Sequence, residues 1–129
     1  MTITCYEGEY GPTIRLDIKT SADLTLLCQL VWKLAVEDVV QDDLCKVLGC
    51  DSEAIQSLIV ECVPERPSKA IELKGHGSEG RIFSWASNAA GWQDLAERLD
   101  AILLVGFSGP RYLTREDVDD AFVELCYRE

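Results

Sequence analysis

The alternation of apolar and polar residues predicts a half-buried β-strand near the start of the chain. Over Thr13–Lys19, Ile14, Leu16 and Ile18 share one face, and charged residues share the other. The charged face suits a strand at the edge of a sheet, where water solvates it. Residues 1–12 are polar and contain glycine, so we expect them to form a lead before the strand.

Two segments repeat apolar residues at helical spacing and predict the two longer helices. The first helix spans about Ala22–Asp38 and follows a capping box that starts at Thr20. The second spans about Ala90–Leu104 and opens at Asn88 or Ala89. Trp32, in the first helix, is expected to lie in the core.

The centre of the chain predicts a β-hairpin. The runs Lys69–Lys74 and Arg81–Ser87 are β-rich and flank the six residues GHGSEG. These residues contain the pattern Gly-x-Gly-x-x-Gly, but a phosphate-binding loop leads into a helix, and a strand-like run follows here. We therefore interpret GHGSEG as the hairpin loop, with His76 solvated at its tip.

Two further segments have less decisive patterns. Asp42–Leu48 predicts a short helix stopped by Gly49, and a second short helix would carry Ile55, Leu58 and Ile59. The last segment, Thr114–Glu129, favours a helical start, with a final strand after Asp120 as the alternative.

These elements together predict an α+β fold in a single domain that spans residues 1–129. A small, mainly antiparallel sheet with a central hairpin would be covered on one face by the two longer helices. A strand from the ends of the chain could join this sheet.

Charge and cysteine usage narrow the classes of function. The chain has 23 acidic and 12 basic residues and a net charge of −11, which disfavours nucleic acid and anionic membranes and favours a basic protein partner. It has six cysteines without a Cys-x-x-Cys pair and one histidine, so we expect no metal and no cofactor. Reduced thiols, and no signal peptide or membrane span, predict a cytoplasmic protein.

The acids cluster in two stretches, residues 37–53 and 116–124. Adjacent carboxylates such as Asp42 and Asp43 do not face each other on a helix, and no nucleophile or base accompanies them, so we expect no enzyme. Exposed acids can instead attract a basic protein. The predicted protein-binding residues are Glu37, Asp38, Asp42, Asp43, Glu116, Asp117, Asp119 and Asp120.

The stretch QDDLCKVLGCDSEAIQSLI resembles the helix-turn-helix of bacterial DNA-binding domains, and the hairpin after it would be the wing (residues 41–87). The alternative function is therefore a winged helix-turn-helix domain or a degenerate relative. Its groove-facing positions would include Asp51 and Glu53, and these acids oppose phosphate binding.

In size, acidity and lack of a catalytic set, the chain resembles small bacterial toxin-immunity proteins as a class. The resemblance implies a non-enzymatic protein that neutralises a basic toxin by occlusion. It is compatible with a monomer or a homo-oligomer.

Overall fold

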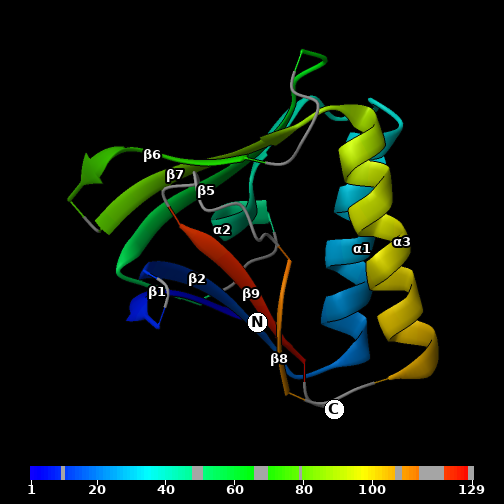
Figure 1. The fold of residues 1–129 in the computed structure, drawn as a ribbon, viewed down its shortest axis with the longest axis horizontal. Coiled ribbons are helices and arrows are strands. Elements are labelled where there is room, and N and C mark those ends of the chain that lie inside the picture. The colour runs from blue at the N-terminus through cyan, green and yellow to red at the C-terminus, as the bar shows by residue number, and fades with distance from the viewer. Residues whose placement is uncertain are drawn as a thin grey trace.

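The computed structural model describes residues 1–9, 11–47, 51–65, 70–78, 80–106, 109–113 and 121–127. It confirms the α+β fold, with two long helices on one side and the strands on the other (Figure 1). The strands form two sheets, which we call sheet A and sheet B.

Sheet A contains both ends of the chain and has the order β4-β1-β2-β9-β8. The pairs β1–β2 and β8–β9 are antiparallel, whereas β1–β4 and β2–β9 are parallel. Its strands are β1 (Thr2–Gly8), β2 (Gly11–Ile18), β4 (Asp51–Glu53), β8 (Gly109–Tyr112) and β9 (Phe122–Tyr127).

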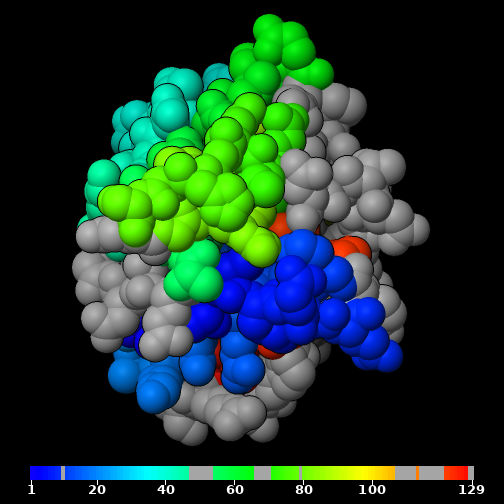
Figure 2. Space-filling view, turned by 90° about the vertical axis from the view of Figure 1, so that its left-hand side faces the viewer, coloured from blue at the N-terminus to red at the C-terminus, as the bar shows by residue number. Residues whose placement is uncertain are grey.

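Sheet B contains the central hairpin and has the order β3-β5-β7-β6. The predicted hairpin is confirmed, because β6 and β7 pair antiparallel. The pair β3–β5 is antiparallel and β5–β7 is parallel. The strands are β3 (Gln41–Asp43), β5 (Ile55–Cys62), β6 (Ala70–Gly77) and β7 (Gly80–Ser87). Seen from the side away from the long helices, the β6–β7 hairpin lies above the β1–β2 hairpin (Figure 2).

The expectation of a single, mainly antiparallel sheet differs from this layout. The strands divide into two sheets, and each sheet is mixed because β2 pairs in parallel with β9 and β5 pairs in parallel with β7. The predicted polar lead is also wrong, since most of it is strand β1, and Ile3 is fully buried. β2 lies between β1 and β9 and is not an edge strand.

The two long helices are close to their predicted limits. α1 spans Ser21–Ala35, and its N-cap Thr20 accepts a hydrogen bond from the Asp23 amide at 3.2 Å. α3 spans Ala89–Val105, and its N-cap Asn88 accepts one from the Gly91 amide at 2.9 Å. The two helices pack against each other along their length.

The short helices are only partly as expected. α2 spans Leu44–Val47 and begins after strand β3, so the predicted start at Asp42 is wrong; Gly49 lies outside the described residues. The second short helix is also wrong, because Ile55, Leu58 and Ile59 belong to β5. A bulge between Ile55 and Ser57 breaks the strand alternation there. For the C-terminal segment, the alternative of a final strand is confirmed, because β9 forms there. Residues 114–120, where a helical start was expected, lie outside the described part.

The core lies between the helices and the inner faces of both sheets. Its largest side chains include Trp85 of β7 and Trp92 of α3, whose rings meet edge to face with centroids 5.2 Å apart. The Trp92 indole also donates to the Glu61 carbonyl at 2.9 Å. α3 is thereby fixed to β5 and β7 at once. None of the described helices is long and apolar enough to cross a bilayer.

A shared carboxylate joins the two long helices. The Asp100 carboxylate of α3 accepts two hydrogen bonds from α1, one from the Cys28 thiol at 2.8 Å and one from the Trp32 indole at 2.9 Å. Burial, the hydrogen bond to Asp100 and its negative charge raise the pKa of Cys28 to about 12. Cys28 is therefore a buried donor, and Trp32 is only partly buried, not in the core as expected.

This tie predicts a pH dependence of stability. The pKa of Cys28 is raised in the folded state, so its contribution is fully present below pH 9 and is lost between pH 9 and about 12 as the unfolded thiol ionises. Urea unfolding followed by circular dichroism should show the free energy of unfolding falling over this range. In the variant Cys28→Ala this decrease should be much smaller. The control variant Cys62→Ala should still show most of the decrease. If the free energy of unfolding of Cys28→Ala fell with pH as steeply as that of wild type, Cys28 would not be the group responsible.

Candidate functional site

The segment of residues 36–42, called the acidic turn below, follows α1 and includes the first two residues of β3. It closes α1 with two bonds typical of a helix end: the Asp38 amide donates to the Lys33 carbonyl at 2.9 Å, and the Glu37 amide to the Leu34 carbonyl at 3.2 Å. The Cys62 amide then donates to the Val40 carbonyl at 2.8 Å. The turn is thus held at both ends, against α1 and against β5.

The predicted residues Glu37 and Asp38 lie exposed on this turn. Glu37 has φ = 60°, a left-handed conformation that glycine normally provides and that costs other residues roughly 1 kcal/mol or more. Both acids also follow the C-terminal end of a helix, where negative charge is unfavourable. The acids at this position therefore lower stability, and such costs are typical of functional surfaces.

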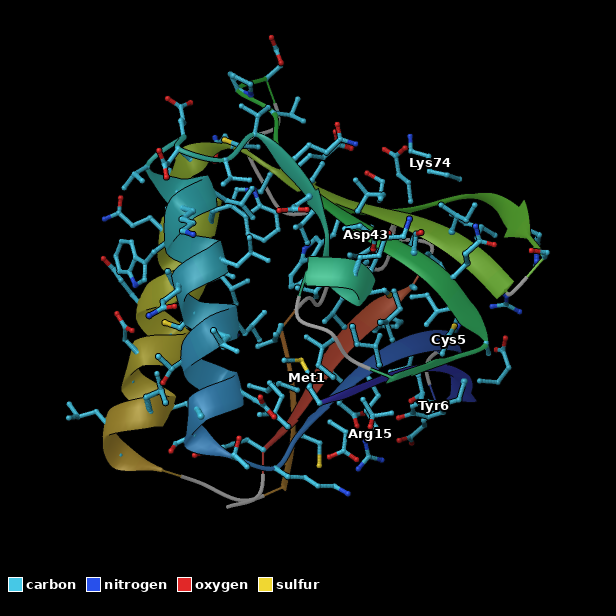
Figure 3. The ribbon with its side chains drawn as sticks, turned by 180° about the vertical axis from the view of Figure 1, so that it is seen from behind. Met1, Cys5, Tyr6, Arg15, Asp43 and Lys74 are labelled. Atoms are coloured by element: carbon cyan, nitrogen blue, oxygen red, sulfur yellow. The ribbon has the colours of Figure 1, made fainter. Side chains whose placement is uncertain are left out.

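The neighbouring acids of β3 have different roles. Asp43 is largely buried, and its carboxylate accepts the Cys45 amide at 3.0 Å and the Leu58 amide at 3.3 Å (Figure 3). It therefore holds α2 against β5 and is a structural residue. Asp42 is partly exposed, and its carboxylate accepts a hydrogen bond from the adjacent Asp43 amide at 2.9 Å. Asp42 can thus still present charge on the acidic turn.

Five of the described bases are close to acids. The Lys74 nitrogen lies 3.0 Å from a Glu72 carboxylate oxygen. In four more ion pairs the nitrogen–oxygen distance is 3.8–3.9 Å: Arg15–Glu124, Lys46–Asp43, Arg81–Glu7 and Arg98–Asp94. By contrast, Glu37, Asp38 and Asp42 form no ion pair with a base in the described part of the chain. Glu37 is also close enough to Cys62 that, after burial, its charge raises the pKa of that thiol. Among the described residues, the acidic turn therefore carries three acids without an ion-pair partner, and Lys33 in the last turn of α1 precedes them.

The other half of the predicted surface, Glu116, Asp117, Asp119 and Asp120, lies outside the described residues.

A second polar group lies on sheet A, on the face that points away from the core. Glu124 of β9 is almost fully buried and accepts the Tyr6 hydroxyl at 3.0 Å. Arg15 of β2 lies 3.8 Å from Glu124 and donates to the Cys126 sulfur at 3.1 Å. Figure 3 shows Tyr6 and Arg15 on this same side. The group links β1, β2 and β9, and Arg15 Nε is buried in it without a hydrogen-bond partner among the described residues.

Sequence reasoning missed this group. Alternation places Arg15 and Glu124 on the outer face of their own strands, which was the available signal. What the pattern lacks is the pairing of Arg15 with Glu124 across two parallel strands more than a hundred positions apart in sequence. Without that pairing, the charged face of β2 resembles a solvated edge.

The glycine motif of the hairpin is a turn, but a tighter one than expected. β6 continues to Gly77 and β7 begins at Gly80, so most of the six residues belong to strands. A Cβ on Gly80, at φ = 136°, would lie 2.8 Å from the backbone of Ala54 and Ile55. The glycine thus permits close packing onto the adjoining chain. His76 is exposed in β6, and its imidazole makes no hydrogen bond to a described side chain.

The helix-turn-helix arrangement is contradicted. Its second helix would contain Gln56, Ser57 and Leu58, which form part of β5 between β3 and β7. The apolar spacing that suggests a helix comes instead from a bulged strand. Within the described ranges, no three histidine, cysteine or carboxylate side chains gather as metal ligands would.

Comparison of the chain with protein-family models, with curated proteins and with solved structures finds no match in any of the three.

The conformation of Glu37 predicts that its removal stabilises the protein. Glu37→Gly relieves the left-handed strain and should raise the free energy of unfolding by about 1 kcal/mol in urea titrations. Asp38→Gly is the matched control, because it removes the same charge at a position without positive φ. Its stability should change little, because the entropy that glycine loses on folding offsets the small gain from removing the charge. If both variants change stability equally, charge and not conformation is responsible.

Proposed function

We propose that this protein is a non-enzymatic binding domain that recognises a basic protein partner. By class resemblance to toxin-immunity proteins, the partner is a basic toxin that the domain neutralises by occlusion. The observation that supports the proposal most directly is the set of acids Glu37, Asp38 and Asp42, which have no ion-pair partner among the described residues, in a chain of net charge −11.

Two features favour binding over catalysis. The exposed His76 has no described partner that could make it a general base, and the buried carboxylate Glu124 is already bound by Tyr6 and Arg15. The acids of the acidic turn are, in contrast, exposed and held on a well-bonded backbone. Such charges speed encounter with a basic protein and fix its orientation.

Charge reversal tests this proposal. The purified protein is titrated with any basic protein encoded by a gene adjacent to its own, called the basic neighbour below, and Kd is measured by calorimetry. The variant Glu37→Lys/Asp38→Lys should bind about ten- to a hundred-fold more weakly, because lysines would face the basic partner. The control Glu9→Lys/Glu97→Lys makes the same net-charge change at two exposed positions on other elements.

The control variant should bind the partner only about two- to three-fold more weakly than wild type, because the long-range electrostatic attraction is weaker. Equal losses in the two variants would mean that net charge alone drives binding. A wild-type protein that neither binds the basic neighbour nor protects cells expressing it would contradict the proposed function.

A further inference from the structure

We infer that the acidic turn docks a basic polypeptide segment that carries one apolar side chain, and that Val36 and Val40 receive this side chain. The inference rests on the proposed function and names the part of the partner that makes contact.

The first observation is the exposure of two valines within the acidic turn. Val36 is 67 % exposed and Val40 is 64 % exposed, although both are large apolar residues. Val39 between them packs partly against the core and fixes the turn. Exposed apolar side chains of this kind contribute to binding when a partner covers them.

The second observation is the charge around these valines. Glu37, Asp38 and Asp42 lie on the same seven residues, and the C-terminal end of α1 adds its own partial negative charge. Here two apolar side chains are surrounded by acids. The complementary partner segment therefore has an apolar side chain surrounded by lysines or arginines. A second copy of this acidic chain, or a nucleic acid, would be repelled here.

A second strongly exposed apolar pair lies at the end of α3. Leu104 and Val105, at the end of α3, are even more exposed, at 87 % and 82 %. The nearest acid before them on that helix, Asp100, is already bound by Cys28 and Trp32. Of these two strongly exposed apolar pairs, only Val36 and Val40 therefore lie beside acids that have no ion-pair partner among the described residues.

The backbone of the acidic turn is ordered before any partner arrives. Its helix-end bonds and the bond from Cys62 to Val40 hold both valines in place. A preformed surface loses little conformational entropy on binding, so even a short peptide can report on it.

The test uses two peptide probes, RKRLRKR and RKRSRKR, which differ only in the central leucine. Each is titrated into ¹⁵N-labelled protein at about 20 mM salt, where surface charges are weakly screened. The leucine peptide should bind about five-fold more tightly, because it alone buries apolar surface. Amide shifts should concentrate in residues 36–42.

The variant Val36→Ser/Val40→Ser should bind both peptides with the affinity of the serine peptide. The control Leu104→Ser/Val105→Ser should keep the five-fold preference. Equal binding of the two peptides by the wild-type protein, or shifts spread over all exposed acids, would overturn the inference. Self-association of the wild-type protein that Val36→Ser/Val40→Ser abolishes would instead assign the valines to a second copy and also overturn the inference.

Failure here is distinguishable from failure of the proposed function. If the valine variant still binds the basic neighbour protein as tightly as wild type while Glu37→Lys/Asp38→Lys does not, the function stands and the valine contact is wrong. If wild type binds no basic protein, the function itself fails.

Discussion

The passage of the chain from sheet A to sheet B is the constraint on which the rest of the structure depends. β4 ends at Glu53 and β5 begins at Ile55, so Ala54 alone separates strands of different sheets. Ala54 adopts φ = 62°, and its carbonyl accepts the Arg81 amide at 3.3 Å. Arg81 then reaches β1, where it lies 3.8 Å from Glu7. One strained residue and one arginine thus fix how the two sheets meet, and the helices cover the core that this junction encloses.

The features that sequence predicted are those specified by local residues. Thr20 and Asn88 cap helices through neighbouring amides, and the β6–β7 hairpin needs only a short glycine turn. The features that were missed depend on distant partners. β5 was interpreted as a helix because its bulge imitates helical spacing, and only its pairing with β3 and β7 decides for a strand.

The same reasoning applies to the candidate site. Sequence identified the acids Glu37, Asp38, Asp42 and Asp43 together, but it could not separate their roles. The amides of Cys45 and Leu58 converge on Asp43 because α2 folds back on β5. Glu37 differs through a backbone angle that no composition encodes. The division between acids that hold the fold and acids that face solvent is therefore a tertiary property.

The bond from Asp100 to the Trp32 indole gives the protein a built-in optical reporter. Of its three tryptophans, Trp85 and Trp92 are sealed in the core, while Trp32 is partly exposed and lies beside the Cys28 thiol. Its emission should be red-shifted, quenched by the neighbouring sulfur and accessible to acrylamide, unlike that of the other two. Movement of α1 against α3 would change this one signal and leave the emission of the core tryptophans constant.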